Sequence, residues 1–87
     1  MQKNIWNREE REVKKATHLN APIVTILGKS EIYVENYKGI IEYSNQCIRL
    51  NTSVGILSIL GSEIWIREMN NESIKIYGDL DGAIFKG

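Results

Sequence analysis

The sequence predicts an all-β domain over residues 22–87, built from antiparallel hairpins and folded as a small two-sheet sandwich or roll. Three observations support this prediction. After Pro22 apolar and polar residues alternate with a period of two, turn-forming residues interrupt the alternation at short intervals, and the segments between the turns repeat one another. A β-solenoid is the alternative that such repeats also allow.

Residues 1–21 are predicted to form a tail in which a short helix is marginal. Asn7 is placed as an N-cap with Glu10 at the position of a capping box, and helix-forming residues continue to Ala16. The segment has too few apolar residues to bury a wide stripe, so we expect a short helix or a disordered tail anchored by Trp6. Pro22 marks the boundary before the sheet.

The β domain divides into about seven or eight short strands. In chain order they are predicted at Ile23–Leu27, Glu31–Glu35, Gly39–Ser44, Cys47–Leu50, Gly55–Leu60, Glu63–Glu68, Ser73–Gly78 and Gly82–Lys86. The stretch Val24–Val34 is repeated at Leu57–Ile66, and Gly39–Leu50 aligns in the same way with Gly55–Ile66. Each unit is a strand, a tight turn and a strand, and four hairpins in a row are expected. Turns are placed at Asn45-Gln46, Gly61-Ser62 and Gly78-Asp79.

Taking every second residue assigns one apolar face to these strands. It comprises Val24, Ile26, Ile32, Val34, Ile41, Tyr43, Ile48, Leu50, Leu57, Ile59, Ile64, Ile66, Ile74 and Ile76. A flat sheet would expose this face, so the hairpins must fold over each other. Two-residue turns containing glycine favour such hairpins over the wider corners of a solenoid. Because free strand edges invite pairing, we also expect a homo-oligomer or a complex.

Composition and charge exclude several classes of protein. Lysine plus arginine total 11 and aspartate plus glutamate total 11, so no net positive field favours nucleic acid as a partner. Cys47 is the only cysteine, which favours a reducing cytoplasm. The sequence has no apolar stretch near the roughly 20 residues of a transmembrane helix, so we expect no direct membrane span.

No set of residues predicts catalysis, a metal or a cofactor. His18 is the only histidine and lies in the tail, and Cys47 has no apparent base beside it. Asp79, Asp81 and Gly82 resemble part of a calcium loop, but the distal glutamate of an EF-hand is absent and a plain turn is the better interpretation. We therefore predict a protein that is not an enzyme.

Tyr33, Arg49 and Trp65 occupy the same position in three successive units and point away from the apolar face. Stacked hairpins would bring them near one another, and aromatic and guanidinium groups are common at the energetic centres of interfaces. A cross-strand ladder that only shields the sheet is the alternative interpretation.

The connection Glu35–Gly39 is longer than the others and mixed in charge. With its flanking residues Val34–Ile40, followed by Glu42-Tyr43-Ser44, it resembles the YabP/YqfC family of sporulation proteins, and most closely the YqfC branch. The likeness extends over roughly Pro22 to Phe85 and includes the closing Ile74–Gly78. Tyr37 stands where the family usually has histidine.

This resemblance implies a protein made in the mother cell of an endospore-forming bacterium and needed to build the spore. It implies a cytoplasmic location, peripheral at the forespore surface through a partner. The membrane-anchored sporulation protein YqfD is the partner that it suggests. It brings no enzymatic activity and no cofactor.

The function expected from these observations is a binding or scaffold module that docks on another sporulation protein. The predicted partner-binding residues are Tyr33, Arg49, Trp65, Asn36, Tyr37, Lys38 and Trp6. Two alternatives stay open, a structural β protein that assembles edge to edge and a module that binds spore polysaccharide through its aromatic row.

Overall fold

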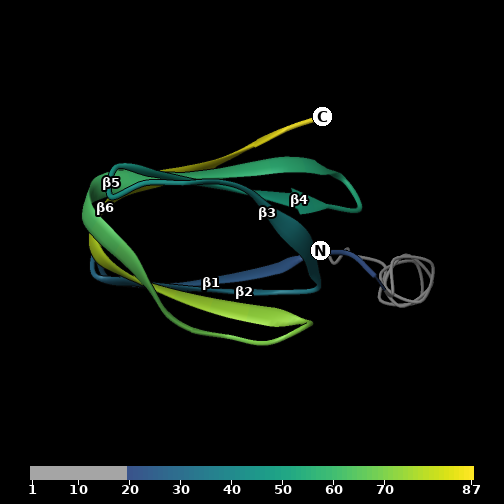
Figure 1. Cartoon of the computed structure of the whole chain (residues 1–87), viewed down its shortest axis with the longest axis horizontal. Helices are drawn as coiled ribbons and strands as arrows, with labels where there is room; N and C mark the ends of the chain where they lie inside the picture. Colours follow the sequence, from purple (N-terminus) through teal and green to yellow (C-terminus); the bar gives the residue numbers. More distant parts are fainter. Residues whose placement is uncertain (1–19) are drawn as a thin grey trace, which may run out of the picture.

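The structure, a computed structural model, describes residues 20–87 and shows a six-stranded antiparallel sheet (Figure 1). Its strands are β1 (Ile23–Leu27), β2 (Glu31–Glu35), β3 (Tyr37–Tyr43), β4 (Cys47–Thr52), β5 (Gly55–Met69) and β6 (Ser73–Lys86). The predicted all-β, antiparallel fold is therefore confirmed. The predicted tail helix lies outside the described residues.

The sheet is rolled on itself so that its two halves face each other (Figure 1). The strand order is β1-β2-β6-β5-β4-β3, and β5 and β6 run through both halves. The first part of β5 pairs with β4, whereas the first part of β6 pairs with β2. This is the rolled form of the predicted architecture. Since every pairing is antiparallel, the β-solenoid alternative is wrong.

Two of the predicted hairpin turns are instead bends within long strands. Gly61-Ser62 lies inside β5 and Gly78-Asp79 inside β6, so each strand joins two of the short strands predicted from the sequence. The pairing of β5 with β6 shifts register on both sides of Gly61-Ser62. At this corner a Cβ atom on Gly61 would meet the backbone oxygen of Asp79. Glycine is needed here because two backbones approach closely, and not because the chain reverses.

The core lies between the two halves of the roll and takes side chains from β2 to β6. Its buried apolar residues are Ile32, Val34, Tyr37, Ile48, Leu50, Leu57, Ile59, Ile64, Ile74, Ile76 and Leu80, and Val24, Ile66 and Ala83 pack against them. Ile26, Ile41 and Tyr43 were predicted to be buried with this set but are half exposed. They lie on the edge strands β1 and β3, where only one neighbouring strand covers them. In addition, β3 carries two bulges that break its alternation.

The β1–β2 and β3–β4 hairpin turns form hydrogen bonds with the bends of β6 and β5. In the β1–β2 turn, the carbonyl oxygens of Lys29 and Ser30 accept hydrogen bonds from Leu80 and Gly78 of β6. The Asn45-Gln46 turn between β3 and β4 is confirmed, and its carbonyl oxygens accept bonds from Ile64 and Gly61 of β5. Backbone groups that the bends would leave unpaired are thereby satisfied.

At the other end of the roll, the segment between β2 and β3 crosses from one half to the other. Asn36 adopts a left-handed conformation with a φ of 66°, and its backbone N–H donates to the carbonyl oxygen of Glu72 at 2.6 Å. Its side-chain amide donates to the carbonyl oxygen of Ala21 at 2.9 Å. Asparagine tolerates this conformation better than most residues, which explains its place at the crossing.

Tyr37 follows the crossing and is buried, and its hydroxyl group donates a hydrogen bond to the carbonyl oxygen of Asn70 at 2.7 Å. This bond joins β3 to the β5–β6 turn. Tyr37→Phe is therefore expected to lower the free energy of unfolding by about 1 kcal/mol, as measured by urea denaturation. The control is Tyr33→Phe, because the Tyr33 hydroxyl makes no hydrogen bond within residues 20–87. Equal losses in the two variants would contradict the role given to the bond.

Candidate functional site

One outer surface of the roll gathers aromatic rings and cations, and we call it the aromatic face. It consists of Tyr33 of β2, Trp65 and Arg67 of β5, and Lys75 and Tyr77 of β6. Tyr33 lies between the buried Ile32 and Val34, so strand alternation turns its ring outward. Trp65 and Tyr77 are direct cross-strand partners, and their ring centroids lie 5.6 Å apart at a tilt of 42°.

The cations of this face lie over its rings. The Arg67 guanidinium carbon is 5.9 Å from the Trp65 centroid and 5.2 Å from that of Tyr77, and the Lys75 ammonium is 5.7 Å from that of Tyr33. Such cation–π contacts hold long side chains in place and so reduce the conformational entropy that binding would cost. Arg67 is the extra residue of a bulge between Ile66 and Glu68, which aims its side chain out of the regular pleat.

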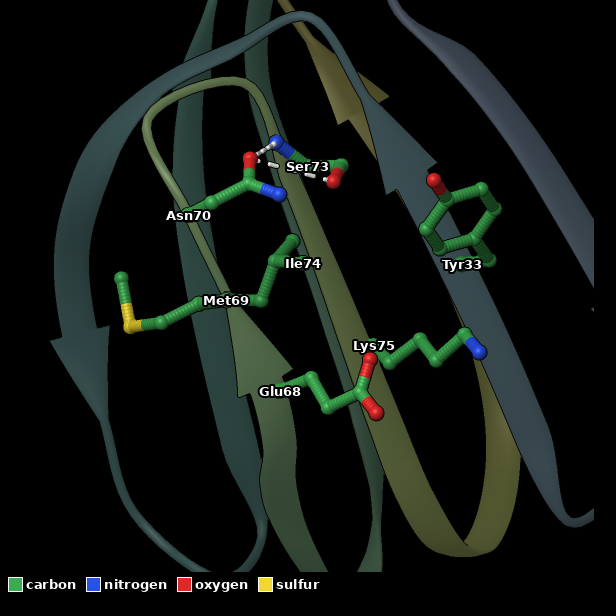
Figure 2. Close-up of a pocket in the computed structure, with 7 residues that line it drawn as sticks. All are labelled: Tyr33, Glu68, Met69, Asn70, Ser73, Ile74 and Lys75. Atoms are coloured by element: carbon green, nitrogen blue, oxygen red, sulfur yellow. Dashed lines mark hydrogen bonds between the residues drawn. The ribbon is translucent and has the colours of Figure 1, made fainter.

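A shallow hollow of about 370 Å³ adjoins the aromatic face at Tyr33 and Lys75 (Figure 2). Glu68, Met69, Asn70, Ser73 and Ile74 complete its lining. The Asn70 side-chain oxygen accepts hydrogen bonds from the backbone N–H groups of Glu72 and Ser73 and from the Ser73 hydroxyl. These bonds shape the β5–β6 turn that borders the hollow. The face therefore combines one exposed and two partly buried rings with polar groups next to a depression, as protein interfaces commonly do.

The family model of the YabP family matches residues 18–87, which include every described strand but none of the first seventeen residues. This chain belongs to the YabP family. The YabP-family chain is also 28% identical over 76 residues to the uncharacterized protein YqfC of Bacillus subtilis (strain 168). That alignment covers 87% of this chain and 82% of YqfC. The predicted family is thus confirmed, and membership indicates a sporulation-related protein.

In this YabP-family chain, Tyr33 and Trp65 share the aromatic face, as the sequence predicted, but Arg49 does not. Arg49 lies on β4 between β3 and the first part of β5, in the other half of the sheet. Its guanidinium nitrogen donates to the Glu42 carboxylate at 3.3 Å across the strands. The expectation that three equivalent positions would come together is wrong for Arg49, because the repeats are not stacked hairpins.

The other predicted residues have different surroundings. Asn36 and Tyr37 hold the crossing between β2 and β3 through their hydrogen bonds, whereas Lys38 is the exposed extra residue of a bulge in β3. Trp6 lies outside the described residues. Partner binding by these four residues stays a prediction.

Three residues of the aromatic face were missed from the sequence, namely Arg67, Lys75 and Tyr77. Alternation with Ile74 and Ile76 on the apolar face places both Lys75 and Tyr77 on the outer side of their strand. That signal was available for Tyr77. The same alternation places Arg67 on the outer side, two residues after Trp65, so the signal was available for Arg67 as well. The bulge that Arg67 occupies depends on the pairing of β5 with β6 and gives no signal in the sequence.

No candidate catalytic or metal-binding centre emerges from the part of the YabP-family chain that the structure describes. Within residues 20–87 no three His, Cys, Asp or Glu side chains are grouped so as to hold a metal ion. Cys47 is a free, partly exposed thiol. The same residues contain no helix long and apolar enough to cross a membrane.

Proposed function

We propose that this protein is a binding or scaffold module of spore assembly in the mother cell, which docks through its aromatic face on another sporulation protein. Tyrosine, tryptophan and arginine are the residues most often found at the energetic centres of protein interfaces. The observation that carries the proposal is the exposed Trp65 ring beside the partly buried Tyr77 ring, with the Arg67 guanidinium over both.

The chemistry of the face indicates the kind of partner surface that it fits. Trp65 and Tyr33 offer rigid apolar area, while Arg67 and Lys75 supply donors for carboxylate or carbonyl groups. Glu31 lies opposite Tyr77 and Glu68 opposite Lys75, so the face is mixed in charge. A protein segment with both apolar and polar groups matches this mixture better than a uniformly charged polymer does.

The resemblance supplies a first partner to test, the membrane-anchored sporulation protein YqfD. Binding to it would hold this chain at the forespore surface from the cytoplasmic side. The link to sporulation comes from membership of the YabP family. The location in the mother cell, the docking role and YqfD as the partner are proposed.

The test is the double substitution Tyr33→Ala with Trp65→Ala in the full chain. Since alanine at a central tyrosine or tryptophan commonly costs about 2 kcal/mol or more, each change should weaken binding by about 30-fold. The tagged variant should therefore lose the proteins that the wild-type chain captures from sporulating cells, with YqfD examined by direct titration. Circular dichroism checks that the sheet is retained.

The matched control is Phe85→Ala. Phe85 and Trp65 have the same exposed fraction, 45%, but Phe85 lies near the end of β6 in the other half of the roll. Its variant should keep the captured proteins. An unchanged set of captured proteins in the Tyr33→Ala, Trp65→Ala variant would refute docking through the aromatic face.

A further inference from the structure

The edge strand β1 is unprotected against pairing with another strand. It lies at one end of the sheet, so one side of its backbone has no partner strand among the described residues. Its sequence, IVTIL, has no charge, and its register with β2 has no bulge. Ile23, Ile26 and Leu27 are each about half exposed. Natural edge strands usually carry charges, prolines or bulges that prevent such pairing.

The opposite edge strand, β3, shows these protections. Its register with β4 shifts twice, at Lys38 and at Ile41, and it carries charged side chains at Lys38 and Glu42. Its last residue, Tyr43, accepts a hydrogen bond at its hydroxyl oxygen from the backbone N–H of Ile66 in β5. The two ends of one sheet therefore differ, and only β1 offers a regular, uncharged edge.

We infer that β1 pairs antiparallel with β1 of a second copy of this chain, about a two-fold axis through Thr25. In that register Thr25 faces Thr25 of the second copy, Ile23 faces Leu27, and Val24 faces Ile26. Every apolar residue thus meets an apolar residue, and no charge is left opposed or unpaired. A strand whose sequence complements itself in this way fits a closed two-fold dimer.

The inner side of β1 supports the same register. Ile26 is paired with the buried Ile32, so its side chain belongs to the inner face, yet half of it remains exposed. A largely apolar hollow of about 300 Å³ opens beside it, lined also by Ile32 and Leu80. Val24 of the second copy would lie next to Ile26 and extend the core across the axis.

Dimerisation would also bring two aromatic faces onto one continuous surface. Thr25 is the direct cross-strand neighbour of Tyr33, and both point to the outer side of the sheet. The inference does not rest on the proposed docking function, because it follows from the edge alone.

The test uses the full chain and two charge variants, Thr25→Lys and Thr25→Glu, with analytical ultracentrifugation. The wild-type chain should show a reversible monomer–dimer equilibrium. Each variant alone should dimerise at least about tenfold more weakly, because like charges meet at the axis. An equimolar mixture of the two should associate again, since residue 25 of one copy then faces the opposite charge.

Ile41→Lys on β3 is the control for position, and it should leave dimerisation unchanged. The Tyr33→Ala, Trp65→Ala variant should still dimerise, which separates this inference from the docking proposal. The inference is overturned if the wild-type chain stays monomeric at roughly 1 mM, near the weak end of specific affinities. It is also overturned if Ile41→Lys, and not Thr25→Lys, dissociates the dimer, or if the mixed charge variants fail to associate.

Discussion

Gly78→Ala is expected to lower the free energy of unfolding by about 3 kcal/mol, from backbone strain and overpacking together. Gly78 has a φ of 141°, a conformation that residues with a Cβ atom rarely adopt. A Cβ atom there would also lie 2.6 Å from the carbonyl oxygen of Glu63 and from the Cα atom of Ile64. Both are backbone atoms of β5 at the bend, so neither can turn aside as a flexible side chain would. Urea denaturation monitored by tryptophan fluorescence measures the loss.

The matched control is Gly82→Ala on the same strand. A Cβ atom at Gly82 meets nothing within 4 Å, and its φ is not in the left-handed region. Its replacement should change the free energy of unfolding by less than about 1 kcal/mol, in the stabilising direction if the unfolded chain loses more freedom. If the two variants were equally stable, the close approach of β5 and β6 at the bend would be contradicted.

The same bend shows where sequence reasoning about the fold succeeds and where it stops. The glycines at positions 61 and 78 were correctly identified as points where the backbone departs from a regular strand. A positive φ or an absent Cβ serves a hairpin turn and a bend in a continuous strand equally well. The choice between them depends on which distant strand lies beside the glycine, here β6 beside Gly61 and β5 beside Gly78. The residues next to each glycine in the sequence do not determine which distant strand it contacts.

Edge strands are a second place where buried residues could not be predicted from the sequence. Alternation correctly assigned nearly all of the core, because central strands are covered on both sides and keep a regular pleat. It was wrong for Ile41, which is the extra residue of a bulge, because a bulge is defined by the pairing of two strands. Tyr43 lies opposite the buried Ile48, so its inward side was correctly assigned, but it is half exposed because β3 ends the sheet. Alternation was wrong for Ile26 because periodicity does not reveal which strand ends the sheet.

The aromatic face was also predicted only in part from the sequence. Tyr33 and Trp65 were predicted to be outward and close, and alternation alone suffices for the outward part. Their shared surface depends on the β2-β6-β5 order, in which β6 contributes Tyr77 and Lys75 between them. Arg49 was grouped with them on sequence equivalence, but equivalent repeats share a surface only if the chain stacks them in order. Here β4 pairs with the first part of β5 and so lies apart.

The second large effect is expected at Ile76, in the middle of the first half of β6. Ile76 is 0% exposed and is the direct cross-strand partner of both Ile32 and Ile66. Ile76→Ala should lower the free energy of unfolding by about 4 kcal/mol, because a close-packed core does not collapse into the space that is left. Small domains are stabilised by only about 5 to 15 kcal/mol in total, so this variant can unfold outright. Ile76→Val should lower the free energy of unfolding by only about 1 kcal/mol, so this variant stays folded and its unfolding can be measured.

Ile84→Ala on the same strand is the control that separates burial from strand propensity. Ile84 is 50% exposed and pairs with Ser58 on the outer side of the other half of the sheet. Both substitutions replace a β-branched residue by alanine, so loss of strand propensity is common to them and amounts to no more than about 1 kcal/mol. The amount by which Ile76→Ala lowers the free energy of unfolding more than Ile84→Ala does measures the packing between the two halves of the roll. Equal losses at the two positions would mean that the halves do not pack on each other, and the roll itself would then be refuted.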